Sequence, residues 1–166
     1  MKNIATSLWF GDNNCEEAIR YYVSIFPNSK IMSMKKYPDE SLDEHFQGMA
    51  GKVITAEFIL NGQKYIGLDG GPVFHFNEAI SLTIECESQD EIDYYWDKLS
   101  FVKEAEQCGW VKDRFGLSWQ IVPDNMGELL QTDAQIRAMM GMKKIIIHEL
   151  EEAGKEEGHF DHENRI

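Results

Sequence analysis

The stretch CGWVKDRFGLSWQIVP, residues 108–123, places one polar amide, Gln120, inside an otherwise apolar strand pattern. A carboxamide both donates and accepts hydrogen bonds, so at this position it could orient a polar ligand beside Trp110 and Trp119. Two alternatives remain open. Gln120 would face solvent or pair with a neighbouring backbone group, and the tryptophans, with Trp9 near the N-terminus, would pack in the core or at a dimer interface.

Two further side chains could act as an acid or a base. His75 lies in the GPVFHF segment and could act as an acid or a base at physiological pH, but the sequence shows no partner for it, and such a histidine is more often structural. Asp69 is the only acid near the end of its predicted strand. The pair His159-x-x-His162 has helical spacing for a metal, but it lies in a polar stretch that we expect to be frayed.

Composition limits the classes of partner. The chain has 166 residues, with 16 Lys and Arg against 29 Asp and Glu, and its formal net charge of -13 would repel a nucleic-acid backbone. No apolar run reaches the ~18 residues that cross a bilayer, so we expect a soluble, cytoplasmic protein without a membrane partner. The three cysteines form no C-x-x-C pair, and we expect buried thiols at Cys15, Cys86 and Cys108.

An internal repeat organises the chain. Residues 5–26 and 79–100 align without a gap, and identical residues meet at Ala5 and Ala79, Ser7 and Ser81, Leu8 and Leu82, Glu17 and Glu91, and Tyr21 and Tyr95. Each copy has a strand-like run, then a cap residue three positions before a glutamate, then an apolar helical stripe. The pairs Asn14 with Glu17 and Ser88 with Glu91 therefore predict two capping boxes, each of which starts a helix.

Strands follow each predicted helix. In the first half we predict them at about 29–37, 52–60 and 63–69, with the Asn-Gly of LNGQ forming a two-residue hairpin turn. In the second half the corresponding strands are at about 103–107, 108–113 and 117–122. Each half is therefore strand, helix, strand, strand, strand. The acidic loop 38–51 is either a mobile cover for a pocket or a solvated surface loop.

Residues 124–154 read as two short helices packed on this β-core. Thr132 or Asp133 would cap the first, Gly141 would break the pattern and Gly154 would end it. We expect a single domain over 1–154, with module one at 1–74, module two at 75–123 and a frayed polar tail at 155–166.

The segments LWFGDNNCEEAIRYYVSIFPNSKI, YIGLDGGPVFHFNEAISLTIEC and CGWVKDRFGLSWQIVPD resemble the vicinal oxygen chelate superfamily, which includes glyoxalase I, bleomycin resistance proteins and extradiol dioxygenases. The similarity is greatest to its PhnB-like branch. It implies an α+β fold in which two βαβββ modules form a curled mixed sheet around a cavity, with extra C-terminal helices here. Members commonly dimerise, so the resemblance also implies a homodimer.

Metal-using members of the superfamily hold a divalent ion with residues from the first and last strand of each module. The resemblance places Ser7, Ile66, Ser81 and Gln120 at those four positions. Neutral hydroxyls, an alkyl group and one amide are poor ligands for a divalent cation, so we expect no metal and no other cofactor. We expect instead a small-molecule cavity, with Trp9, Trp110 and Trp119 as further candidate wall residues.

Three functions stay open, and the sequence does not decide whether the protein is an enzyme. The favoured one is a PhnB-like homodimer that binds a small organic molecule of unassigned identity without a conventional metal site. The first alternative is a metal-dependent lyase, isomerase or dioxygenase with displaced ligands drawn from Asp69, His75 or Glu57. The second is a non-catalytic assembly or regulatory protein. The methyltransferase label that PhnB-like proteins sometimes carry lacks a supporting Gly-rich turn that opens a helix.

Overall fold

The computed structural model describes residues 4–38 and 48–163, with side chains described as far as Lys155. The chain divides into two compact units, Met1–Phe76 and Asn77–Ile166, each with its own sheet. The predicted loop at 38–51 falls largely outside the described residues, so its covering role stays a prediction.

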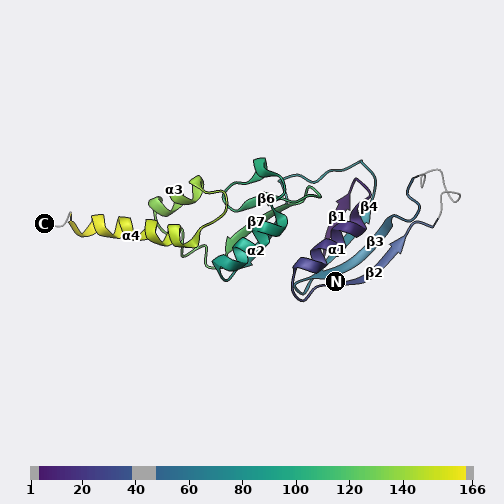
Figure 1. Ribbon diagram of the computed structural model, residues 1–166, viewed down its shortest axis with the longest axis horizontal. Helices are drawn as coiled ribbons and strands as arrows, with labels where there is room; N and C mark the ends of the chain where they lie inside the picture. The colour runs from purple at the N-terminus through teal and green to yellow at the C-terminus, as the bar shows by residue number, and fades with distance from the viewer. Residues whose placement is uncertain (1–3, 39–47, 164–166) are drawn as a thin grey trace. The chain divides into compact units, whose positions relative to one another are not determined.

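The first unit is a four-stranded mixed sheet with one helix against it (Figure 1). Its elements are β1 (Thr6–Phe10), α1 (Cys15–Ile25), β2 (Lys30–Lys36), β3 (Val53–Leu60) and β4 (Gln63–Asp69). The strand order is β1-β4-β3-β2, with β1 parallel to β4 and the other pairs antiparallel. These elements confirm the prediction for the first half of the chain.

The turn between β3 and β4 is the predicted two-residue hairpin. Leu60 pairs with Gln63, and the two residues between them, Asn61 and Gly62, have positive φ angles of 44° and 83°. Asn and Gly tolerate this left-handed backbone better than other residues, which is why they direct such a turn. The turn fixes the register of β4 and so decides which of its side chains share a face.

The start of α1 differs from the prediction. Asn14 is the N-cap residue, but its side chain makes no capping hydrogen bond, so the predicted box with Glu17 is wrong. The acceptor comes from the end of β4, where Asp69 Oδ1 accepts the backbone N–H of Cys15 at 2.9 Å. A carboxylate from a distant strand thus satisfies a free helix N–H, which local sequence spacing does not reveal.

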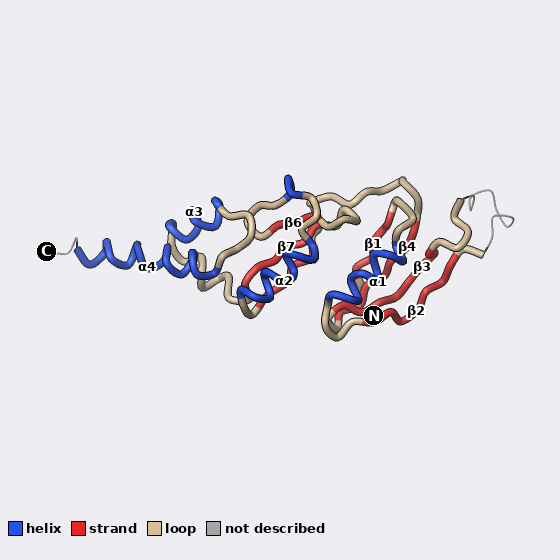
Figure 2. The backbone as a smooth tube through the Cα atoms, in the orientation of Figure 1, coloured by secondary structure: helices blue, strands red, loops and turns tan. Residues whose placement is uncertain are grey.

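The second unit repeats the topology with one strand fewer (Figure 2). Its elements are β5 (Leu82–Cys86), α2 (Gln89–Leu99), a 3₁₀ turn (Lys103–Ala105), β6 (Trp110–Lys112) and β7 (Ser118–Pro123). The strand order is β5-β7-β6, and β5 runs parallel to β7 just as β1 runs parallel to β4. The parallel pairing of first and last strand in both units confirms the internal repeat.

The predicted strand at 103–107 is wrong, because this segment contains the 3₁₀ turn. Lys, Glu and Ala favour helical backbone over strand, and the segment has no alternating apolar pattern. The side chain of Glu106 then folds inward, where it accepts hydrogen bonds from Ser100 Oγ at 2.5 Å and Lys103 Nζ at 2.8 Å. The hydrogen bonds from Lys103 and then Ser100 hold the pKa of Glu106 below its usual value.

The caps of the later helices follow the sequence more closely. Ser88 Oγ accepts the N–H of Glu91 at 3.3 Å at the start of α2, as predicted. The carboxylate of Glu91 reaches back to the N–H of Glu87 at 2.8 Å, one residue before the cap. Thr132 forms a complete capping box with Gln135 at the start of the next helix, α3 (Asp133–Gly141).

Two helices, α3 (Asp133–Gly141) and α4 (Ile147–Glu163), follow the second sheet. Gly141 ends α3 as predicted, but α4 runs through Gly154 to Glu163, so the predicted stop at Gly154 is wrong. Gly154 serves packing instead, because a Cβ there would lie 2.6 Å from Gln135 Nε2. These helices and the loops beside them share a cluster of buried side chains, which consists of Leu129, Met142, Ile145 and Leu150.

Neither sheet closes on itself, and the fold is α+β, with two small sheets that each pack against a helix. Within the described part of the chain, no helix has both the length and the apolar composition needed to cross a membrane.

Candidate functional site

Each sheet has one face covered by a helix and one face turned away from it. In the first unit, a Cβ on Gly67 would lie 2.7 Å from Ile19 Cδ1 and 2.9 Å from Cys15 Sγ, so Gly67 faces α1. Its strand neighbour Ile66 therefore points to the other side. We call that side the first open face, and it carries Ser7, Trp9, Glu57, Lys64 and Ile66.

Ser7 and Ile66 are brought together on the first open face. They are direct register partners between β1 and β4, and Glu57 of β3 continues the row beyond Ile66. Ser7 is exposed and Ile66 is half-buried. Glu57 is held by Lys64, whose Nζ lies 2.9 Å from Glu57 Oε2. This row therefore offers a hydroxyl, an alkyl group and a carboxylate that is already paired.

Trp9 lies on the same face, but its ring packs against the chain that follows β4. The indole Nε1 donates to the carbonyl of Gly71 at 3.0 Å, and Phe74 meets the ring edge to face at 5.0 Å between centroids. Gly70 is required beneath it, because a Cβ there would lie 1.9 Å from Trp9 Cζ2. Trp9 is thus a fixed aromatic wall at the edge of the first open face.

In the second unit, the covered face contains Val111, Trp119 and Ile121, which are all buried. Their strand neighbours Trp110 and Gln120 are half-buried and are register partners on the opposite side. We call that side the second open face, and it carries Ser81, Thr83, Trp110, Lys112, Ser118 and Gln120.

The predicted pair Ser81 and Gln120 is brought together by a hydrogen bond. Gln120 Nε2 donates to Ser81 Oγ at 2.9 Å, which holds the amide across β5 and β7. Thr83 is the register partner of Gln120 on β5, so its hydroxyl lies on the same face. Sequence reasoning missed Thr83, Lys112 and Ser118, although alternation outward from Gln120 along β7 would have found Ser118.

Trp119, a predicted wall residue, points away from the second open face. It is 2% exposed on the helix side, and its Nε1 donates to Asp113 Oδ2 at 2.8 Å. Its neighbour Trp110 is the tryptophan that lies beside Gln120. Adjacent residues of a strand point to opposite faces, so Trp119 and Gln120 cannot both lie on the second open face.

The two predicted acid or base candidates lie apart from the open faces. Asp69 is 1% exposed on the helix side, where Oδ1 accepts the N–H of Cys15 and Oδ2 accepts the N–H of Val53 at 3.1 Å. His75 is exposed in the segment between the two units. The side chains of His159 and His162 lie outside the described residues.

The cysteines are not placed for chemistry in the open faces. Burial, assisted by Asp69 and Glu16, raises the pKa of the Cys15 thiol far above its usual value. Burial also raises the pKa of Cys86 to about 12. Cys108 is half-buried and donates from Sγ to the carbonyl of Met139 at 3.4 Å. A protonated, buried thiol is a poor nucleophile and a poor metal ligand.

The residues at the superfamily's metal positions do not suit a divalent cation. Ser7, Ile66, Ser81 and Gln120 provide no imidazole or carboxylate, and the nearby Glu57 is already paired with Lys64. Among the described residues, no group of three or more His, Cys, Asp and Glu side chains is arranged to hold a metal. The donor set instead suits hydrogen bonding to an organic ligand.

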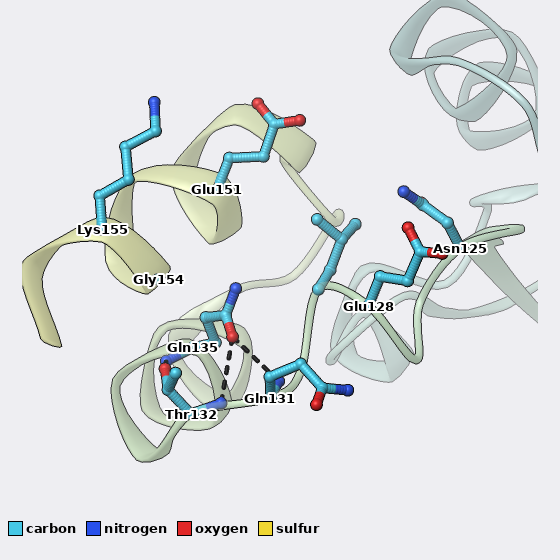
Figure 3. Close-up of a pocket in the computed structure, with 9 residues that line it drawn as sticks. Asn125, Glu128, Gln131, Thr132, Gln135, Glu151, Gly154 and Lys155 are labelled. Carbon is cyan, nitrogen blue, oxygen red and sulfur yellow. Dashed lines mark hydrogen bonds between the residues drawn. The ribbon is translucent and has the colours of Figure 1, made fainter. Parts of the chain in front are cut away.

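Two surface hollows lie away from the open faces. One, of about 590 Å³, lies beside the start of α1 and is lined by acidic, amide and basic residues that include Asp12, Asn13 and Lys52. The other, of about 610 Å³, lies between α4 and the chain that leads into α3 (Figure 3). Its lining is mostly polar, and Gln135 at its base is used structurally, accepting from the N–H groups of Gln131 and Thr132.

The match to a family model and the similarity to a solved structure place the protein in the glyoxalase, or vicinal oxygen chelate, superfamily. The family described as 3-demethylubiquinone-9 3-methyltransferase matches residues 2–122. The chain therefore belongs to this PhnB-like family. The match ends before α3 and α4, so these helices are additions to the part that defines the family.

The chain is similar to several solved structures. A PhnB protein from Bacillus cereus is 32% identical over 73% of this chain and 99% of that chain, with a TM-score of 0.59. The protein PA1353 from Pseudomonas aeruginosa is 18% identical over 74% of this chain and 98% of its own, with a TM-score of 0.52, and shows the fold alone. A fosfomycin resistance protein, FosX, from Listeria monocytogenes is 17% identical over 80% of this chain and 99% of its own, with a TM-score of 0.48. The comparison with curated proteins gives no match.

Proposed function

We propose that this protein binds a small organic molecule on its open faces, as a homodimer and without a conventional metal site. The observation that carries the proposal is the hydrogen bond from Gln120 to Ser81, beside Trp110. It fixes an amide and a hydroxyl on a strand surface next to an aromatic ring. A few convergent polar groups among apolar ones are the usual composition of a small-molecule site.

The bond geometry leaves capacity for a ligand. Gln120 uses one N–H toward Ser81, and its Oε1 accepts no hydrogen bond from any described residue. The hydroxyl hydrogen of Ser81 and the hydroxyl of Thr83 lie on the same face. A ligand could therefore accept hydrogen bonds from the hydroxyls of Ser81 and Thr83 and donate one to Gln120 Oε1. Its apolar part would rest against Trp110.

Exposed apolar side chains support the homodimer. Ile4, Val73, Phe74 and Ile80 are 87%, 68%, 60% and 70% exposed, and they flank the first strands of the two sheets. Those strands, β1 and β5, are also the edges of their sheets. Apolar surface beside an unpaired strand edge favours contact with another chain, and we assign that contact to a second copy of this protein.

The methyl transfer in the family's description finds no support in the described residues. The glycines that follow β4 are used for packing, since Gly70 lies against the Trp9 ring and the Gly71 carbonyl accepts from its indole. No helix begins there in the first unit. A Gly-rich turn that cradles a cofactor instead opens directly into a helix, whose N-terminus faces the ligand.

Replacing Gln120 with Leu, or Ser81 with Ala, should weaken ligand binding without unfolding the protein. The loss of one hydrogen bond to a neutral ligand predicts an affinity about three- to tenfold lower. The measurement is ligand-observed NMR with a panel of aromatic acids, amides and alcohols. Gln63→Leu makes the same chemical change at an exposed strand position and is the matched control.

The proposal fails if Gln120→Leu binds every panel member as the wild type does, or if Gln63→Leu loses as much affinity. In either case Gln120 and Ser81 would be packing positions.

A further inference from the structure

Ser118 is a buried hydroxyl without a partner. It lies at the start of β7, is 1% exposed, and its Oγ makes no hydrogen bond with any residue that the structure describes. Alternation along β7 puts it on the second open face together with Gln120, two residues later. A buried polar group that stays unpaired costs stability, so its presence needs an explanation.

An ion pair crosses the same end of β7. Lys112 of β6 is the register partner of Ser118, and its ammonium group pairs with Glu78, three residues before Ser81. Since β7 lies between β6 and β5, Lys112 and the segment that leads into β5 approach the sheet from opposite sides of β7. The pair therefore forms a strap between β6 and the segment before β5, at the end of β7 where Ser118 lies.

The two ends of the strap differ in exposure. The side chain of Lys112 is 26% exposed and that of Glu78 is 60% exposed. Glu78 belongs to the segment 77–80 that leads into β5, and all four of its residues are exposed. The ammonium group is thus fixed on the sheet, while the carboxylate lies on exposed chain that can release it.

We propose that Lys112 and Ser118 form an anion subsite on the second open face, in which Glu78 occupies the place of a ligand's carboxylate or phosphate group. A ligand anion that displaced Glu78 would give the Ser118 hydroxyl an acceptor, while Lys112 would exchange one anionic partner for another. The remainder of the ligand would extend toward Gln120 and Trp110. This inference rests on the proposed function and narrows its ligand to a small organic anion.

The net negative charge of the protein limits anion binding to places that have a local cation. At a net charge of -13 the surface as a whole repels anions, so binding requires a local cation together with a hydrogen-bond donor. Lys112 and Ser118 supply these two groups side by side. An internal carboxylate that must be displaced also discriminates against weak anions.

The experiment uses benzoate and benzamide, which match in shape and differ in charge, together with inorganic phosphate. Each is titrated into the full-length protein, and amide NMR shifts of residues 110–120 report binding. Glu78→Gln removes the competing carboxylate, so we expect it to bind benzoate about five- to tenfold more tightly than the wild type, with benzamide unchanged. Glu104→Gln, an exposed site in the 3₁₀ turn, removes one charge from the same unit and is the control.

Ser118→Ala provides a second, independent readout. It should weaken benzoate binding to the Glu78→Gln protein about tenfold, because a hydrogen bond to a charged group is lost. In the absence of ligand it should raise the thermal midpoint by about 2–4 °C, because an unpaired buried hydroxyl is removed.

The outcomes separate the two proposals. Benzamide binding at residues 110–120 without a preference for benzoate in Glu78→Gln would overturn the anion subsite and leave the proposed function standing. An equal gain in benzoate affinity in Glu104→Gln would show that the effect comes from the overall charge, and would also overturn the anion subsite. If no probe shifts these residues in any variant, both proposals fail.

Discussion

Asp113→Ala should be among the most destabilising substitutions in the second unit, lowering the free energy of unfolding by about 3–4 kcal/mol. The carboxylate is 2% exposed and is an acceptor for two backbone N–H groups and an indole N–H. Oδ1 accepts from the N–H groups of Phe115 at 2.8 Å and Leu117 at 3.0 Å, and Oδ2 accepts from Trp119 Nε1 at 2.8 Å. Removing it leaves three donors without their acceptor.

Chemical denaturation measures this effect. Asp113→Asn should lower the free energy of unfolding by roughly half as much. The amide keeps one acceptor oxygen, but its NH₂ group faces one of the N–H donors that the carboxylate accepted. Asp97→Asn, at a side chain that is 75% exposed, should stay within about 0.5 kcal/mol of the wild type. A stability for Asp113→Ala equal to that of Asp97→Asn would mean that the 113–117 turn forms without the carboxylate.

Asp69→Ala should destabilise the first unit by about 3 kcal/mol, because it removes one acceptor from two buried backbone amides. The amides belong to Cys15, the first residue of α1, and Val53, the first residue of β3. Asp69 therefore ties the helix and a central strand to the end of β4. Hydrogen exchange should accelerate at these two amides, and the exposed Asp12→Asn is the control.

This prediction also decides the role of Asp69. A structural carboxylate gives faster exchange and lower stability, with ligand affinity unchanged at a temperature where the protein is folded. If Asp69→Asn instead leaves stability and exchange as they are in the wild type but abolishes binding or turnover, Asp69 is a functional acid and the structural assignment is wrong.

The first unit could be predicted closely because its signals are local. The Asn61-Gly62 turn sets the register of β4, and register with alternation places Ile66 opposite Ser7. Predictions from local residue spacing were wrong where a residue far away in the sequence supplies the hydrogen bond. The cap of α1 comes from Asp69, which is 54 residues away from Cys15, and no spacing rule within a helix indicates it.

The second unit shows the limit of the repeat. Its first and last strands pair as in the first unit, but residues 103–105 form a 3₁₀ turn where the repeat predicts a strand. Helix-favouring residues and the inward fold of Glu106 override the analogy. The prediction that Gly154 ends a helix was wrong for a similar reason. Its contact with Gln135 is tertiary and does not mark a helix end.

The sequence predicted which candidate residues meet in pairs, and their role as a site stays a prediction. Ser81 and Gln120 could be named from the repeat and the hairpin, and the structure joins them at 2.9 Å. Trp119 was misplaced because adjacent strand residues point to opposite faces, and only the register shows which of them the helix covers. Whether Ser7, Ile66, Ser81 and Gln120 line one cavity stays a prediction.

A native mass spectrum of untagged protein, purified without chelator, tests the central claim most directly, because it reports assembly, metal and bound ligand together. The account predicts a dimer that carries no stoichiometric divalent ion, with a small organic adduct that Gln120→Leu diminishes and Gln63→Leu retains. A monomer without an adduct would contradict ligand binding by a homodimer. A dimer with about one divalent ion per site would show that the open faces hold a metal through ligands other than Ser7, Ile66, Ser81 and Gln120.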